Sequence, residues 1–134
     1  MILNKKILII GGAGFVGSNL CKALSKNNYV QSLDNYFTGK KENHVEGVTY
    51  IHGNTWNADM IFQDLKEEEY FDTVFHFGEY SRIVQSFNDV DFVHKSILSG
   101  TPTILQLCRK WAAKLIYSAS SSKFFSNERT SFKK

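Results

Sequence analysis

Short apolar runs alternate along the chain with longer segments of helical period. The runs are rich in Ile and Val, and most of them are continuous rather than alternating in polarity, as expected for strands covered on both faces. Strands separated by helical segments are typical of βαβ units, which build a parallel sheet. The pattern predicts five strands, at Ile7–Ile10, Tyr29–Leu33, Val48–Ile51, Thr73–Phe77 and Lys114–Ser118.

The longest helical region runs from Asn88 to Trp111 and is interrupted at Gly100-Thr101-Pro102. Either a kink or two consecutive helices would explain the interruption, with Thr101 as the N-cap of the second helix and Pro102 in its first position. The apolar residues expected to face the interior are Val93, Ile97, Ile104, Leu105 and Cys108.

This order of elements predicts an α/β fold, a Rossmann-type doubly wound parallel sheet that stops after about five strands. At 134 residues the chain has room for one domain with a hydrophobic core. We expect residues 1–122 to form that domain. Residues 123–134 are polar and without clear period, which predicts an irregular tail.

Composition and charge exclude several classes of partner. The 16 basic and 13 acidic residues are mixed along the sequence, so the formal charge of +3 forms no basic stripe that would predict a nucleic-acid partner. No apolar stretch approaches the roughly 18 residues of a membrane helix, and glycines in the first apolar run argue against a signal peptide. We therefore expect a cytoplasmic protein without membrane contact.

Cysteines and histidines give no sign of a metal site. Cys21 and Cys108 lie far apart, each within an apolar helical pattern, which predicts buried free thiols and suits a reducing compartment. The histidines show no metal-ligand spacing with one another or with the cysteines, so no metal is predicted. His76 lies within an apolar strand, where a lone histidine is more often a packed, hydrogen-bonded group than a general base.

The strongest chemical signal is the segment Gly11-Gly12-Ala13-Gly14-Phe15-Val16-Gly17. It directly follows a predicted strand and opens a predicted helix, which is the context that a dinucleotide-binding fingerprint requires. The glycines allow a tight turn and a close approach of the backbone to a pyrophosphate, while the helix start offers free N–H groups. The segment predicts a pyrophosphate loop; the alternative is a glycine-rich turn that binds nothing.

Asp34 ends the second strand about 20 residues beyond this loop, where an acid can hydrogen-bond the hydroxyls of an adenosine ribose. Its charge would repel a ribose phosphate and so favours NAD over NADP. Lys40 and Lys41 follow closely and could offset a phosphate. An ordinary turn acid is the alternative, because Asp-Asn is a common turn pair.

Taken together, these residues resemble the extended short-chain dehydrogenase/reductase family, in particular the N-terminal part of its NAD-dependent epimerases and dehydratases of the UDP-glucose 4-epimerase type. The resemblance covers nearly the whole chain and rests on the glycine pattern, on Asp34-Asn35 and on the serine-rich segment from Ser118 to Ser122. It implies an isomerase or lyase that transiently oxidises a nucleotide-linked sugar with bound NAD. The sugar, and the choice between epimerase and dehydratase, stay open.

The resemblance also assigns cofactor contacts along the chain. Asn54 replaces an acid that contacts adenine in the family, Ser96 replaces an asparagine, and Gly78 is small where strand backbone lies along the cofactor. The implied set is Gly11, Gly14, Phe15, Val16, Gly17, Asp34, Asn35, Gly39, Asn54, Thr55, Phe77, Gly78, Ser96 and Ser118.

The sugar end of the site is less defined. Ser120 aligns with the family's catalytic serine, whose hydroxyl would hold the reacting sugar oxygen; the alternative is a polar strand end. Tyr80, Ser81 and Arg82 follow the fourth strand at the carboxyl edge of the sheet, where they could line a sugar pocket or start a solvent-facing helix. Ser81 stands where the epimerases have a cofactor-contacting lysine.

The family's catalytic Tyr-x-x-x-Lys pair does not occur after Ser120, and neither does a C-terminal substrate domain. A match at Tyr36–Lys40 lies in the loop after Asp34, toward the adenosine end, and is interpreted as coincidence. We therefore expect a truncated enzyme that is nearly inactive alone. A non-catalytic NAD-binding or dimerisation module and a decayed remnant are the alternatives, and the resemblance adds a homodimer as an expectation.

Overall fold

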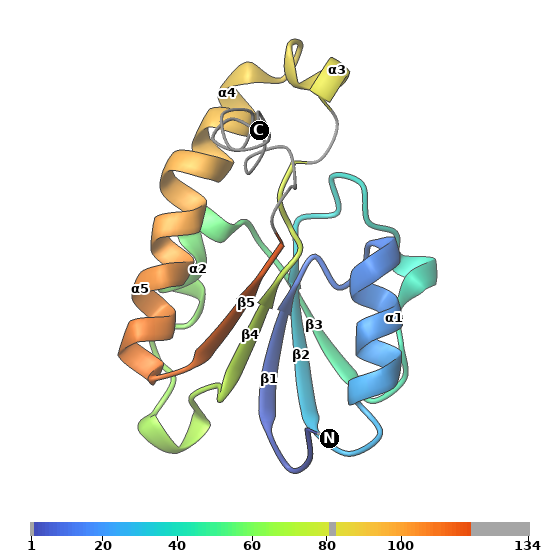
Figure 1. Cartoon of the computed structure of the whole chain (residues 1–134), viewed down its shortest axis with the longest axis vertical. Coiled ribbons are helices and arrows are strands. Elements are labelled where there is room, and N and C mark those ends of the chain that lie inside the picture. The colour runs from blue at the N-terminus through green and yellow to red at the C-terminus, as the bar shows by residue number, and fades with distance from the viewer. Residues whose placement is uncertain (1, 81–82, 119–134) are drawn as a thin grey trace, which may run out of the picture.

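The computed structural model describes residues 2–80 and 83–118, which form a parallel sheet with helices on both faces (Figure 1). The strand order is β3-β2-β1-β4-β5, and all the neighbouring pairs are parallel. The strands are β1 (Lys6–Ile10), β2 (Tyr29–Asp34), β3 (Val48–His52), β4 (Thr73–His76) and β5 (Lys114–Tyr117). This confirms the Rossmann-type α/β sheet that the sequence predicts.

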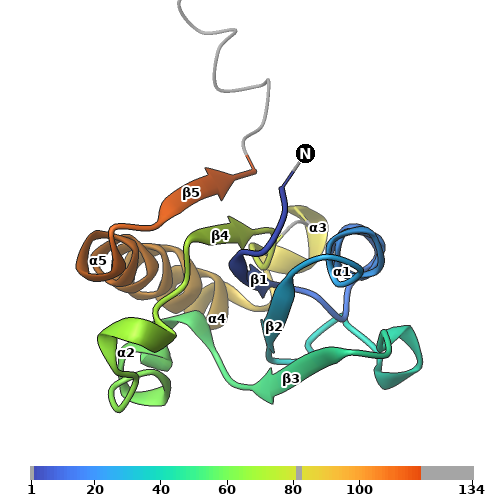
Figure 2. The same ribbon diagram turned by 90° about the horizontal axis from the view of Figure 1, so that it is seen from below.

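Helix α1 packs on one face of the sheet, whereas α2, α4 and α5 lie on the other (Figure 2). The α-helices are α1 (Phe15–Leu24), α2 (Ala58–Ile61), α3 (Ile83–Ser86), α4 (Val90–Lys95) and α5 (Thr101–Trp111). Three 3-10 turns, η1 (Lys41–Asn43), η2 (Thr55–Asn57) and η3 (Glu67–Glu69), and a π-helical turn, η4 (Ser96–Gly100), complete the described elements. None of the helices in these ranges is long and apolar enough to cross a membrane.

Strand β1 shows why the apolar runs are continuous. Successive side chains of a strand point to opposite faces, so Ile7 and Ile9 pack toward Cys21 of α1, while Leu8 and Ile10 pack toward α2 and α5. All four strand residues are almost fully buried. A central strand between two helical layers needs apolar residues at every position, and this sequence supplies them.

The segment from α4 to α5 is one continuous helical rod with a π-helical turn inside it (Figure 1). Thr101 has helical backbone angles (φ −61°, ψ −46°), so the expectation that it caps a second helix is wrong. Pro102 has no N–H and would clash with the carbonyl four residues before it in a regular α-helix. The wider turn ends at Gly100, two residues before Pro102, and the helix continues through this proline.

The interior face of the rod differs in part from the prediction. Ile104 and Cys108 are buried as expected, but Ile97 and Leu105 are 46% and 50% exposed. The buried residues of α5 follow one helical face with i, i+3, i+4 and i+7 spacing, and Leu105 falls outside it. They are Ile104, Leu107, Cys108 and Trp111.

Candidate functional site

The glycine loop joins β1 to α1 with almost no room for side chains. Gly11 has φ +85°, in the left-handed region, and Gly14 immediately precedes α1 as its N-cap. A Cβ on Gly17 would lie only 2.1 Å from the carbonyl oxygen of Gly11. The helix therefore begins directly against the loop, and its first N–H groups, which have no partner within the helix, point beyond its start.

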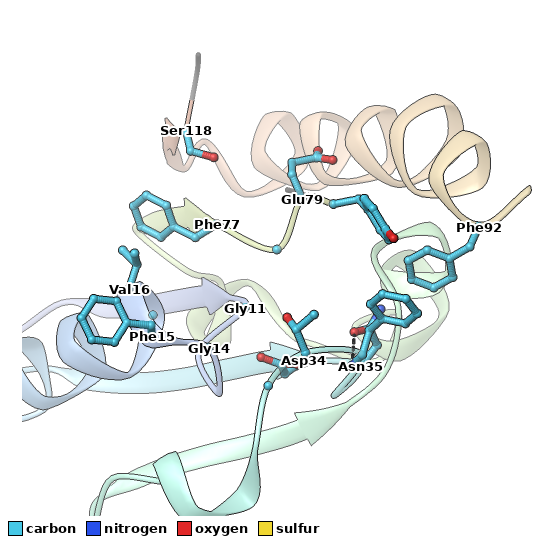
Figure 3. Close-up of a pocket in the computed structure, with 16 residues that line it drawn as sticks. Gly11, Gly14, Phe15, Val16, Asp34, Asn35, Phe77, Glu79, Phe92 and Ser118 are labelled. Atoms are coloured by element: carbon cyan, nitrogen blue, oxygen red, sulfur yellow. Dashed lines mark hydrogen bonds between the residues drawn. The ribbon is translucent and has the colours of Figure 1, made fainter. Parts of the chain in front are cut away.

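A cavity of about 450 Å³ opens above this loop, at the carboxyl ends of the strands (Figure 3). Cavities of this size hold small-molecule ligands and cofactors. It brings together most of the residues that the sequence assigned to a cofactor, together with Tyr80. The predicted cofactor residues that line it are Gly11, Gly14, Phe15, Val16, Gly17, Asp34, Asn35, Gly39, Phe77, Gly78 and Ser118.

A smaller cavity of about 30 Å³ adjoins the first and shares part of its lining. Thr55 and Ser96, two further predicted cofactor residues, line this second cavity and are buried. Asn54 lines neither cavity. Its Oδ1 accepts a hydrogen bond of 3.0 Å from Nδ2 of Asn35, so Asn54 orients a lining residue instead.

Asp34 is fixed to the glycine loop by its own carboxylate. The backbone N–H of Ala13 donates to Oδ2 at 2.8 Å, and the N–H of Tyr36 donates to Oδ1 at 2.8 Å. Each carboxylate oxygen has two lone pairs, so both oxygens can accept a further hydrogen bond from a ligand. The end of β2 and the loop after β1 thus present one joint surface to the cavity.

Backbone from two strands meets closely beside this surface. A Cβ on Gly11 would lie 3.0 Å from the backbone nitrogen and Cα of Gly78, and a Cβ on Gly78 would lie 2.7 Å from Cγ2 of Ile10. Both glycines line both cavities. Side chains at either position would push these two backbone segments apart, so the glycines let both segments line the space in which a cofactor is expected to lie.

Four residues that line the larger cavity were not predicted from the sequence: Phe37, Thr38, Glu79 and Phe92. Phe37 and Phe92 stack on each other although they lie on distant segments, and no spacing in the sequence signals such a contact. Glu79 could have been predicted from the sequence, because an acid directly after the glycine at a strand end is a recognisable candidate for a site residue. Its Oε1 accepts hydrogen bonds from Thr101 Oγ1 (2.6 Å) and from the Tyr117 hydroxyl (3.2 Å).

His76 is a packed interior residue, as predicted, and lines neither cavity. It is 1% exposed, and its Nε2 lies 3.5 Å from Oε1 of Glu79. Within the described residues neither ring nitrogen has a hydrogen-bond partner, so the expected hydrogen bond is not found. Burial lowers the pKa of His76, and the nearby charge of Glu79 opposes that shift only in part. Burial therefore favours the neutral form of the imidazole.

The remaining predictions concern the cysteines, metal ligands and Tyr36. Cys21 and Cys108 are buried free thiols, and burial raises the pKa of Cys108 to about 11. Over residues 2–80 and 83–118, no group of three or more His, Cys, Asp or Glu side chains could hold a metal ion. The Tyr36 hydroxyl shares a hydrogen bond of 2.9 Å with Nε2 of His44. Ser81, Arg82, Ser120 and the segment 123–134 lie outside the described residues.

Comparison with known proteins identifies the family of this chain. The sequence matches the NAD dependent epimerase/dehydratase family over residues 7–133. The chain belongs to this family. UDP-glucuronic acid decarboxylase 3 of Arabidopsis thaliana is 32% identical over 123 residues, which cover 88% of this chain and 34% of that relative. A putative UDP-glucose 4-epimerase of Methanocaldococcus jannaschii is 34% identical over 119 residues, or 86% of this chain and 37% of the relative.

A solved structure agrees with these relatives. The UDP-glucose 4-epimerase of Thermus thermophilus, in complex with NAD, matches with a TM-score of 0.74 and 27% identity over 86% of this chain and 37% of that one. This chain of the epimerase/dehydratase family spans about a third of the length of the curated relatives it matches. The predicted fold and family are confirmed, and NAD is the family's cofactor, as the sequence predicts.

Proposed function

We propose that this chain is the NAD-binding portion of a nucleotide-sugar epimerase or dehydratase. When bound, NAD would accept hydride from the sugar and later return it, so that the sugar is oxidised only transiently. The observation that carries the proposal is the junction of Asp34 with the glycine loop, where one carboxylate bonded to Ala13 N–H faces the 450 Å³ cavity. A family member that holds both parts of a dinucleotide fingerprint on one cavity is suited to bind the cofactor.

The residues at the two ends of the cavity set the direction of the cofactor. Phe15, Val16, Phe77 and Ser118 lie at one end, and Asp34 lies toward the other (Figure 3). Asp34 would accept hydrogen bonds from the adenosine ribose hydroxyls, while the first N–H groups of α1 would bind the pyrophosphate. The nicotinamide would then lie at the Ser118 end, against the apolar side chains.

The sugar is expected beyond that end. Ser118 follows β5. Its backbone N–H and its hydroxyl each donate a hydrogen bond of 3.3 Å to the carbonyl oxygen of His76. Ser120 comes two residues later and is our candidate for holding the reacting sugar oxygen. Relatives include an epimerase solved with UDP-glucose, from Thermotoga maritima, which supports a nucleotide sugar as the substrate. Ser81 and Arg82 are weaker candidates for the same pocket, whereas the ring of Tyr80 lies against Phe37 and Phe92.

We expect these 134 residues to bind NAD without turning over a sugar. Proton removal needs a base whose pKa is close to the working pH, and an unperturbed tyrosine near 10 is poor without a neighbouring cation. The residues after Ser120 supply no Tyr-x-x-x-Lys pair. A non-catalytic NAD-binding module is the alternative, and coding sequence that supplies the pair downstream would argue against it.

Exposed apolar side chains on the outer side of the α4–α5 rod support the expected homodimer. Ile97, Leu98 and Leu105 are 46% to 60% exposed, and such residues tend to be covered when they form a contiguous patch. Sedimentation velocity of the purified chain would test this expectation. A strictly monomeric species at about 50 μM would exclude dimerisation through this face, since the dissociation constant of such a dimer is expected to be about micromolar or lower.

Calorimetric titration tests the proposed function. Wild-type protein should bind NAD more tightly than NADP, and Asp34→Ala should weaken NAD binding by about tenfold or more, because hydrogen bonds to a charged group contribute about 1.5–3 kcal/mol. Asp59→Ala, at an exposed acid in α2, is the matched control and should bind like the wild type. A wild-type chain that is folded by circular dichroism and binds neither nucleotide would refute the proposal.

A further inference from the structure

Three aromatic side chains form one wall of the larger cavity: Phe37 after β2, Tyr80 after β4, and Phe92 in α4. We call them the aromatic wall. The rings of Phe37 and Phe92 are nearly parallel, with centroids 4.6 Å apart and planes 17° apart. Tyr80 contacts both, with centroids 5.5 Å from Phe37 and 6.1 Å from Phe92. The wall therefore joins three separate segments at the cavity.

The aromatic wall is held in place from behind. Trp56 meets Phe92 edge-on, with centroids 5.5 Å apart, and the ammonium group of Lys95 lies 5.1 Å from the centroid of a Trp56 ring. The Tyr80 hydroxyl donates a hydrogen bond of 2.8 Å to Oδ2 of Asp89, next to the start of α4. Side chains fixed in this way lose little conformational freedom when a ligand covers them.

Phe37 nevertheless leaves much of its ring uncovered, since it is 47% exposed. Its backbone N–H donates to Oδ1 of Asn35 at 3.0 Å, which fixes the segment that carries the ring. Covering an exposed aromatic ring with another flat apolar surface is favourable. The aromatic wall is therefore a fixed surface on which the ring of Phe37 is still partly exposed.

The position of the wall selects the part of the cofactor that would cover it. Phe92 lies with Asp34 and Asn35 at one end of the cavity, opposite Phe15 and Val16 at the start of α1 (Figure 3). If Asp34 holds the adenosine ribose and α1 the pyrophosphate, the base lies on the side of the ribose away from α1. That side is the aromatic wall.

We propose that the aromatic wall is the stacking surface for the adenine base, with Phe37 as the principal contact. The inference rests on the proposed function, since it presumes a dinucleotide in this cavity. Phe37 and Phe92 already stack on each other, so the base adds to the outer face of the stack rather than entering between the rings. Stacking on an aromatic side chain uses the flat face of the base and contributes to affinity without reading its edge.

Calorimetric titration with NAD and with AMP, which carries only the adenosine half, tests the proposal on the full chain. Phe37→Ala should weaken the binding of both ligands by the same factor, about tenfold, the usual effect of removing one base-stacking ring. Phe37→Tyr keeps the ring and should restore binding to within about twofold, whereas Phe37→Leu keeps apolar bulk without a ring and should stay weak. Phe87→Ala, at a 77% exposed phenylalanine that lines neither cavity, is the matched control and should change neither affinity.

Each outcome decides between distinct conclusions. If Phe37→Ala binds NAD and AMP as well as Phe87→Ala does, the stacking role is wrong while the proposed function stands. If Phe37→Leu restores binding as fully as Phe37→Tyr, the contact depends on bulk and the proposal is again overturned. A folded wild-type chain that binds neither ligand removes the proposed function and this inference with it. Thermal unfolding of each variant shows that the compared proteins are folded.

Discussion

Replacement of Gly17 by alanine probes the contact between α1 and the glycine loop. The added methyl group would lie 2.1 Å from Gly11 O, 2.7 Å from Gly11 C and 2.7 Å from Gly12 Cα, all backbone atoms that cannot rotate away. Restoring ordinary contact requires the helix start to move by about 1 Å, and overpacking of this kind costs about 1–3 kcal/mol. Alanine recovers about 1 kcal/mol of helix propensity, so we expect a net loss of about 0–2 kcal/mol in the free energy of unfolding.

The same displacement should weaken NAD binding by at least about tenfold, because the N–H groups at the helix start would no longer meet the pyrophosphate. Gly47→Ala is the matched control. Gly47 also has a positive φ, of +81°, but an added Cβ meets nothing within 4 Å. It should lose about 1–2 kcal/mol of stability from backbone strain and keep its NAD affinity. Urea unfolding and calorimetric titration give both quantities, and unchanged NAD affinity in folded Gly17→Ala would refute the reasoning.

Three further predictions test buried side chains and the contact between Asp72 and β1. Burial holds the pKa of His76 below its ordinary 6.5, so the unfolded chain takes up a proton that the folded chain excludes. The free energy of unfolding should therefore fall as pH drops below about 6.5, by up to about 1.4 kcal/mol per pH unit. His76→Leu should flatten that dependence in urea titrations at a series of pH values, and an unchanged slope would contradict it. Buried Cys21 and Cys108, both with raised pKa, should react with Ellman's reagent at pH 8 only after unfolding in urea, and fast reaction in native buffer would count against their burial. Asp72→Ala removes the 2.8 Å hydrogen bond from Lys6 N–H and should cost about 1 kcal/mol, measured by the same urea titrations; no loss would show that water replaces the carboxylate.

The sheet could be predicted from the sequence because its signal is local. Buried parallel strands need uninterrupted apolar runs, and the glycine loop needs a fixed spacing, so β1, its loop and the end of β2 follow from short stretches of sequence. The predicted strand at Thr73–Phe77 ends at His76 in the structure, and the strand at Lys114–Ser118 ends at Tyr117. Strand ends depend on backbone hydrogen bonds to the neighbouring strand, which composition does not reveal.

The α4–α5 rod shows where local patterns fail. Glycine and proline at Gly100 and Pro102 are ordinary signals of a helix end, yet the rod continues through them by way of a π-helical turn. A Cβ on Gly100 would lie 2.0 Å from Oγ1 of Thr55, so this glycine serves close packing against η2 and not a helix boundary. That contact joins residues far apart in the sequence, and only the folded chain shows it.

The candidate site divides in the same way. Glycines and Asp34 were predictable because a dinucleotide imposes their spacing, whereas the aromatic wall depends on a contact between the loop after β2 and α4. Glu79 is a third case: its position after Gly78 was visible, but its bonds to Thr101 and Tyr117 depend on how α5 and β5 pack beside β4. Residues that bind one shared ligand can be predicted from their spacing in the sequence, whereas residues that meet only through tertiary contacts cannot.

The central claim is that NAD lies across the glycine loop and Asp34, and a titration of the uniformly nitrogen-15-labelled chain with NAD, followed by amide NMR spectra, tests it most directly. The account predicts large shifts at the amides of Phe15, Val16 and Gly17, and at Asp34 and Gly78, with little change in the outward-facing residues of α5. Shifts confined to other parts of the described chain, or none at saturating NAD, would contradict it.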